Sequence, residues 1–214
     1  LMTQISGGVS TELLLRDFAA ALADPEVLAI VLDVDSPGGA PGGVETITNA
    51  IYAARGSKPV VTFATDIMAS AAYWIGSAAA TVIAETTSVV GSIGVLTVHT
   101  DYSRADEKQG VTRTYLTAGR YKALGNDAEP LSMEARQEIQ ARLDYIYTMF
   151  VNTVARNRGV DADTVLSSMA DGRTFIGRQA LDVGLIDALG TIDTAVTTAL
   201  SQAETNHPKL WQRR

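Results

Sequence analysis

Two short apolar runs separated by a helix-like segment constrain the fold of this sequence more than any other feature. Residues 28–34 and 59–64 are almost uninterrupted apolar runs bounded by turn residues, which is typical of strands covered on both faces. Residues 44–54 lie between them and repeat apolar side chains at helical spacing. A strand, a helix and a second strand in this order predict an α/β fold with a mostly parallel sheet.

Periodicity predicts the remaining elements in the same way. We expect helices over residues 13–22, 70–79 and 132–158, and strands over residues 81–84, 93–98 and 112–117. Together they predict one domain over residues 1–201 with a helical C-terminal third, followed by a polar tail over residues 202–214. Because the chain opens at Leu1, we expect a strand upstream of it in the natural protein.

Composition excludes several classes of site and partner. The chain has no cysteine, which excludes disulfide scaffolds, iron–sulfur clusters and thiol nucleophiles. Its two histidines, His99 and His207, are too few for a histidine-rich metal site. The net charge is −7 and no basic stripe is present, so nucleic acid is not an expected partner.

One uncharged stretch has the length of a membrane span but not its composition. Residues 67–84 contain no charge, which meets the crude length criterion for a transmembrane helix. The stretch is rich in Ala, Ser, Gly and Thr, and Asp66 and Glu85 flank it. We therefore expect a buried helix that leads into a buried strand, and any membrane association only through an upstream segment.

The first candidate functional loop follows the first predicted strand. Residues 36–39 read Ser-Pro-Gly-Gly, and ligands of open α/β sheets bind beyond the carboxyl ends of strands. Gly38 and Gly39 would let backbone N–H groups approach a ligand, because no Cβ is in the way. The loop lacks the Gly-Lys-Ser/Thr sequence of a phosphate-binding loop. The alternative is that these residues form only a turn.

The second candidate loop contains a serine. Ser70 follows the strand over residues 59–64 and precedes a helix that begins with Ala71 and Ala72. Small neighbours would let a substrate carbonyl reach the hydroxyl, and backbone N–H groups at the start of the helix would stabilise an oxyanion. The alternative is that Ser70 only caps this helix.

A serine nucleophile requires a base. His207 lies in the polar tail, whereas His99 follows a predicted strand and remains a candidate. The other candidate is Lys122, which follows the strand over residues 112–117 and would have to be held neutral by burial. The alternative for Lys122 is an ordinary solvated surface lysine.

Several blocks together resemble one known family, the signal peptide peptidases, which are serine–lysine peptidases with a ClpP/crotonase-like fold. Residues 35–39, 68–76, 88–95 and 119–125 are similar to its signature blocks and occur in the same order. Residues 171–187 also resemble the family, so the resemblance covers about residues 28–195. The family more often has glycines where this chain has Ala71 and Ala72.

The resemblance implies a mechanism and a set of partners. Ser70 would be the nucleophile, and Lys122, 52 residues further on, the base. Ser92 would orient the lysine amine, and the oxyanion hole would consist of Gly38, Gly39 and Ala71. The family needs no metal and no cofactor, acts on extended polypeptides and assembles into rings.

The natural substrate and compartment stay open. The opening residues 2–8 look more like the phage and prophage branch, which processes head and scaffold proteins in the cytoplasm, than like the membrane-anchored signal peptide peptidases. The small residues around Ser70 favour cleavage after small or hydrophobic residues.

Two rival functions share the expected fold. A crotonase-like acyl-CoA hydratase or isomerase would use the same glycine loop but would need Asp66 or Glu85 as acid and base. A ring-forming assembly protein without catalytic activity is the other rival. Turnover of an acyl-CoA thioester that Ser70→Ala leaves untouched would favour the first rival, and failure of an acylating probe to label Ser70 would favour the second.

Overall fold

The computed structural model describes residues 9–206. The opening residues 2–8 and His207 lie outside the described residues. The described residues divide into two compact units, a core unit made of residues 9–94 and 149–206 and an inserted unit made of residues 95–148.

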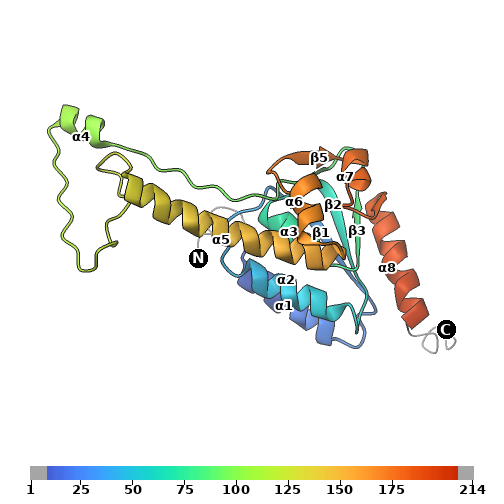
Figure 1. Cartoon of the computed structure of the whole chain (residues 1–214). Helices are drawn as coiled ribbons and strands as arrows, with labels where there is room; N and C mark the ends of the chain where they lie inside the picture. The colour runs from blue at the N-terminus through green and yellow to red at the C-terminus, as the bar shows by residue number, and fades with distance from the viewer. Residues whose placement is uncertain (1–8, 207–214) are drawn as a thin grey trace. The chain divides into compact units, whose positions relative to one another are not determined.

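The core unit contains a six-stranded sheet (Figure 1). Its strands are β1 (Ile30–Ser36), β2 (Val60–Ala69), β3 (Thr81–Ala84), β4 (Val89–Gly91), β5 (Thr174–Ile176) and β6 (Ala188–Leu189). The order is β5-β4-β2-β3-β6, and β1 also pairs with β2. Every pair is parallel except β4 with β5. The prediction of an α/β fold with a mostly parallel sheet is confirmed.

β2 changes its neighbour halfway along its length. Its first half, residues 61–64, pairs with β3, and its last three residues, 67–69, pair with β4. The fully buried Ser88 stabilises β2 at the point where its neighbour changes. Its Oγ donates to the Ala64 carbonyl at 2.7 Å. As a result, the carboxyl ends of β1, β2 and β4 lie at neighbouring positions of one curled sheet.

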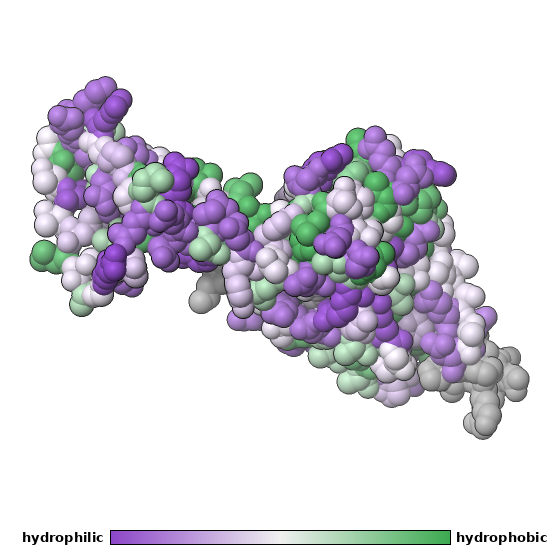
Figure 2. Space-filling view, viewed as in Figure 1, coloured by the Kyte–Doolittle hydropathy of each residue, from purple (hydrophilic) through white to green (hydrophobic). Residues whose placement is uncertain are grey.

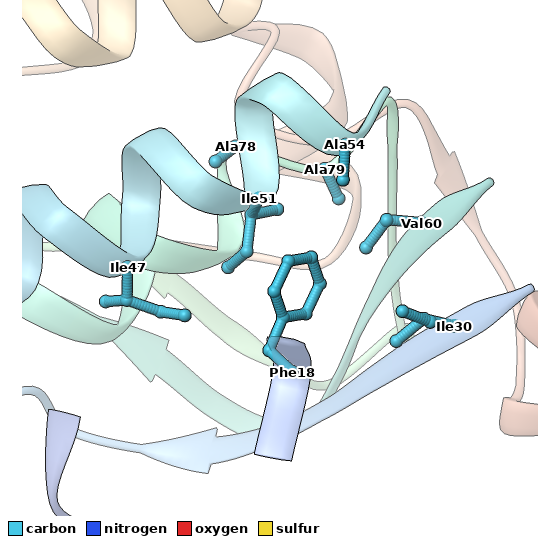
Figure 3. Close-up of a cluster of buried hydrophobic side chains, with 8 residues drawn as sticks. All are labelled: Phe18, Ile30, Ile47, Ile51, Ala54, Val60, Ala78 and Ala79. Atoms are coloured by element: carbon cyan, nitrogen blue, oxygen red, sulfur yellow. The ribbon is translucent and has the colours of Figure 1, made fainter. Parts of the chain in front are cut away.

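Helices cover both faces of this sheet, as the apolar strands predict. The helices are α1 (Thr11–Ala23), α2 (Val44–Ala54), α3 (Ala71–Gly76), α6 (Ala162–Ser168), α7 (Arg178–Asp182) and α8 (Ile192–Asn206). Figure 3 shows Phe18 of α1 among Ile51 of α2 and the strand residues Ile30 and Val60. The next residue along β2, Val61, packs on the other face against α8, because strand side chains alternate.

The first residues of the expected polar tail over residues 202–214 belong to a helix. Residues 202–206 continue α8. Ala203 is buried, and Gln202 Nε2 donates to Thr81 Oγ1 at 2.9 Å. These contacts hold the last turn of the helix against the sheet, which a polar composition alone does not predict.

The inserted unit contains α4 (Ser103–Gln109) and the start of α5 (Met133–Arg158), whose last turns belong to the core unit. The long predicted helix is therefore confirmed, but the strands predicted over residues 93–98 and 112–117 are wrong. Both segments are irregular, and Leu96 and Leu116 are 83% and 93% exposed. An alternating pattern makes a strand only where another strand pairs with it, and neither segment has such a partner among residues 9–206.

Polar contacts hold the inserted unit. Arg113 bonds to Asp127 at 2.9 Å and forms an ion pair with Asp106 at 2.9 Å. The Tyr115 hydroxyl donates to the same Asp127 carboxylate at 2.9 Å. Figure 2 shows mostly hydrophilic or neutral residues around α4, with hydrophobic residues scattered among them.

The uncharged stretch over residues 67–84 is the end of β2, α3 and β3, as expected. Within residues 9–206, no helix combines the length and the apolar character that a bilayer span requires.

Candidate active site

Three parallel strands place serines at their carboxyl ends. Ser36 ends β1 and pairs with Met68 of β2, and Ala69 at the end of β2 pairs with Gly91 at the end of β4. Ser70 and Ser92 directly follow this last pair. The structure thus brings together the loops at the ends of β1, β2 and β4, as the parallel sheet predicts.

Ser70 occupies a strained position between β2 and α3. Its φ of 52° and ψ of −126° are unusual for a residue with a side chain and cost about 1–3 kcal/mol. The Ser70 N–H donates to the Gly91 carbonyl at 2.8 Å, and the Trp74 N–H donates to the Ser70 carbonyl at 2.9 Å. These two bonds hold the strained turn in place.

The side chain of Ser70 does not cap α3. Ser70 has the N-cap position, yet its hydroxyl makes no capping hydrogen bond. It has no hydrogen-bond partner within residues 9–206, and the residue is half-buried. A serine on a strained strand-to-helix turn with a free hydroxyl is the arrangement of nucleophilic serines in several hydrolases. The capping alternative therefore does not explain this residue.

Gly38 packs directly against the serine turn. Its φ is +102°, and a Cβ built on it would lie 2.7 Å from Ser70 Cβ and 2.9 Å from the Ala71 nitrogen. Only glycine has both this backbone conformation and this close approach. Ala71 opens α3, so its N–H has no acceptor within the helix. The glycine loop thus passes beside an unpaired N–H.

Gly39 differs from Gly38. It is exposed, and a Cβ built on it would meet no atom within 4 Å. The two glycines that the sequence places together therefore have different surroundings, and only Gly38 is required to be glycine by space.

Ser92 is the second residue with a side chain and a positive φ, at 51°. Its N–H donates to the Arg173 carbonyl at 2.8 Å, and a Cβ on Gly94 would lie 3.3 Å from Gly172 Cα. Residues 171–173 therefore pack against residues 92–94. Hydrogen bonds from the Arg173 side chain and from its backbone hold the pKa of Asp171 below its usual range.

Two large buried side chains of α3, Tyr73 and Trp74, anchor the helix in the core unit. The Tyr73 hydroxyl donates to the Leu185 carbonyl at 2.8 Å, and burial raises the pKa of Tyr73 well above its ordinary value. Trp74 stacks on Phe150 of α5 with ring centroids 4.5 Å apart. Tyr73 and Trp74 belong to the signature block of residues 68–76, but their residue types alone do not predict this packing.

Arg55 holds the chain that follows α3. Its guanidinium donates to the carbonyls of Ser77, Ala78 and Ala79 at 3.3, 2.8 and 2.7 Å, and to the Asn157 carbonyl at 2.9 Å. Sequence analysis missed Arg55, since a single arginine at a helix end carries no signal of contacts more than 20 residues away.

Lys122 lies in the inserted unit, in a turn of residues 119–125. Its N–H donates to the Gly119 carbonyl at 3.1 Å, and its side chain lines a hollow of about 430 Å³ formed by residues 115–118 and 122–126. The residue is exposed. The expected burial of Lys122 is therefore wrong for the single chain, because no apolar layer of the inserted unit covers the turn.

His99 and the two candidate carboxylates have other surroundings. His99 Nε2 donates to the Asn126 carbonyl at 2.8 Å, so only Nδ1 is left to accept a proton. Asp66 is exposed on β2, and Glu85 is half-buried after β3. Among the described residues, no three His, Asp or Glu side chains come together to hold a metal ion.

Comparisons with known proteins agree on a family. A model of Peptidase family S49 matches residues 53–206. The head-tail preconnector protein GP5 of Enterobacteria phage P21 is 33% identical over 205 residues, which cover 96% of this chain and 40% of that protein. Capsid assembly protease C of Escherichia phage lambda is 36% identical over 177 residues, which cover 83% of this chain and 40% of that protein.

A bacterial relative has the same level of similarity. The putative signal peptide peptidase SppA of Enterococcus faecium is 34% identical over 176 residues, covering 81% of this chain and 50% of that protein. The chain thus spans half or less of the length of these relatives. The family model covers well over half of the chain, and the chain therefore belongs to Peptidase family S49.

Proposed function

We propose that this chain is a serine endopeptidase that hydrolyses peptide bonds in extended polypeptides through an acyl-enzyme on Ser70. The observation that carries the proposal is the strained turn at Ser70, with its free hydroxyl beside the unpaired Ala71 N–H and the glycine loop. Membership of a peptidase family supports the same reaction.

In the first half of the reaction, Ser70 Oγ attacks the carbonyl carbon of the scissile bond while neutral Lys122 Nζ accepts the hydroxyl proton. The carbonyl oxygen becomes an oxyanion, which accepts hydrogen bonds from Ala71 N–H and from a glycine of the loop. The carbon–nitrogen bond then breaks, and Lys122 returns the proton to the leaving amine.

In the second half, water attacks the acyl carbon while Lys122 again accepts a proton, the ester bond to Ser70 Oγ breaks, and Lys122 returns the proton to Ser70 Oγ as the carboxylic acid product leaves. Ser92 hydrogen-bonds to the lysine amine and orients it. Ser92 follows the strand that pairs with the end of β2, and this position near the Ser70 turn supports a place for Ser92 in the site.

The exposure of Lys122 sets a condition on this mechanism. A lysine acts as a base near neutral pH only when water is excluded from its amine. The bound polypeptide and neighbouring copies of the chain in a ring are the groups that would cover it. A ring-shaped homo-oligomer is therefore part of the proposal.

The substrate class follows from the relatives and the site. Two relatives carry names that refer to phage heads and capsids, and a third is named a putative signal peptide peptidase. We propose a phage head or scaffold protein, or a signal peptide, as the natural substrate, cleaved after small or hydrophobic residues.

Hydrolysis of an unfolded polypeptide such as casein tests the proposal. The Ser70→Ala variant should fold and assemble like the wild type and show no hydrolysis above the uncatalysed background. Casein cleavage at the wild-type rate by Ser70→Ala would falsify the assignment.

A further inference from the structure

One hydrogen bond fixes the shape of the glycine loop. The Gly38 N–H donates to Ser36 Oγ at 3.2 Å, a side-chain turn that reaches across Pro37. Ser36 is the last residue of β1 and pairs with Met68 of β2. The side chain of Ser36 therefore connects the rigid sheet to the first glycine of the loop.

This bond distinguishes the two glycines as hydrogen-bond donors. The Gly38 N–H is occupied by Ser36 Oγ, whereas the Gly39 N–H has no partner among residues 9–206. Sequence analysis left both glycines as candidates for the oxyanion hole. Of the two N–H groups, only that of Gly39 is free to meet a substrate oxygen.

The position of Gly38 links this bond to the nucleophile. The site that a Cβ on Gly38 would occupy is 2.7 Å from Ser70 Cβ and 2.9 Å from the Ala71 nitrogen. A small displacement of Gly38 would therefore move the loop against Ser70 or away from it. Glycine at a φ of +102° has the largest conformational freedom of any residue, so the loop needs an external restraint.

We infer that Ser36 is a positioning residue: its Oγ holds Gly38 against Ser70, and the Gly39 N–H becomes the oxyanion donor that acts together with the Ala71 N–H. This inference rests on the proposed peptidase function. Ser36 takes no proton and forms no bond to the substrate. It acts through Gly38.

The effect of this restraint is confined to the transition state. The oxyanion forms only when Ser70 has attacked, so a displaced donor lowers kcat and leaves KM unchanged. A neutral hydrogen bond of this type corresponds to about a fivefold change in rate.

The first experiment compares two substitutions of the same shape at position 36. Ser36→Thr keeps a γ-oxygen, and Ser36→Val replaces it by a methyl group. We expect Ser36→Thr to retain most of the wild-type kcat and Ser36→Val to lose about fivefold, with equal KM values. Thermal unfolding shows whether both variants fold. Equal kcat for two folded variants would overturn the inference, as would a loss confined to KM.

The second experiment removes single N–H groups. Replacement of the Gly39 N–H by an ester oxygen, introduced by semisynthesis, should lower kcat by about 10²–10³. The same replacement at Gly38 should lower kcat only about as much as Ser36→Val. The reverse order would assign the oxyanion donor to Gly38 and overturn the inference.

The Ser70→Ala variant distinguishes a failure of the proposed peptidase function from a failure of the role inferred for Ser36. If Ser70→Ala hydrolyses casein normally, the proposed function fails, and the role inferred for Ser36 fails with it. If Ser70→Ala is inactive while the Thr and Val variants are equal, only the role of Ser36 fails.

Discussion

The core unit and the inserted unit carry the two parts of the proposed dyad, and they are built in different ways. In the core unit, Ser70 sits in a backbone held by hydrogen bonds on both sides, against a glycine that leaves no space for a methyl group. In the inserted unit, Lys122 lies in an exposed turn. Packing within the core unit fixes Ser70, the proposed nucleophile, and Gly38 beside it, whereas Lys122, the proposed base, depends on what covers it.

After the complete loss expected for Ser70→Ala, the largest effect is expected for Lys122, the proposed base. Lys122→Met should lower kcat by about 10²–10⁴, since it removes the proton acceptor, and Lys122→Arg should be equally impaired because a guanidinium stays charged. Because Lys122 is exposed, thermal unfolding of the single chain should not change.

Lys108→Met is the matched control, since Lys108 is an exposed lysine of α4 in the same unit. It should leave turnover at the wild-type level. Normal turnover of Lys122→Met would contradict the assignment, and so would a His99→Ala variant that is well folded but inactive.

The second effect concerns the close packing in the core unit. Gly38→Ala places a methyl group against Ser70 and the Ala71 nitrogen, and we expect kcat to fall by about 10²-fold, because the displaced loop no longer presents the Gly39 N–H to the oxyanion. Gly42→Ala is the control in the same loop, because a Cβ there meets no atom within 4 Å. If steady-state kinetics show equal turnover for both variants, the loop is only a turn.

The third effect is on stability, and it concerns the support of α3. Arg55→Met leaves the carbonyls of residues 77–79 without their donor, and it should lower the free energy of unfolding by about 3 kcal/mol. Urea unfolding followed by tryptophan fluorescence measures this change.

Arg156→Met is the control for Arg55. The two guanidinium groups lie over the same Tyr52 ring, at 4.5 and 4.4 Å. Arg156 is exposed, and its guanidinium donates to the side-chain oxygens of Asn49 and Asn157. Arg156→Met should therefore lower the free energy of unfolding by about 1 kcal/mol or less. Equal losses for the two variants would show that stacking on Tyr52, not the carbonyl bonds, accounts for the effect of Arg55.

The smallest effect concerns acid and the inserted unit. Hydrogen bonds from Tyr115 and Arg113 hold the pKa of Asp127 below its usual range. A carboxyl group with a lowered pKa stabilises the folded state above its unfolded pKa of about 3.9, and this contribution is lost as the pH falls below that value.

Hydrogen exchange of residues 95–148 should therefore speed up by a few-fold between about pH 5 and pH 3, after correction for the intrinsic pH dependence of exchange. Asp127→Asn should remove this additional dependence. An unchanged profile in Asp127→Asn would assign the acid response to other carboxylates of the unit.

The sequence predicted the core unit far better than the inserted unit, for a physical reason. Apolar runs such as residues 28–34 and 59–64 form strands because buried neighbours on both faces are close in the same chain. The alternating pattern of residues 112–117 also predicts a strand, but nothing among the described residues pairs with it. Alternation of apolar and polar residues indicates that a segment can form a strand, but the strand forms only where a second strand pairs with it.

The candidate site follows the same division. The predicted strands over residues 28–34 and 59–64 were enough to place Gly38 and Ser70 after strands of one sheet, whereas Ser92 was named only through the family resemblance, because the short strand β4 before it was not predicted. The difference between Gly38 and Gly39, the strained φ of Ser70 and the contacts of Arg55 depend on exact three-dimensional approach, which residue types do not encode. The burial expected for Lys122 came from the chemistry required of a base, and the single chain does not provide it.

Covalent labelling of the intact chain by a fluorophosphonate probe, followed by mass spectrometry, tests the central claim most directly. The Ser70/Lys122 mechanism predicts one label per chain, located on Ser70, with labelling abolished in Ser70→Ala and strongly slowed in Lys122→Met. The Lys108→Met control should be labelled at the wild-type rate. Labelling of Ser70→Ala, or labelling of Lys122→Met as fast as the wild type, would contradict the account.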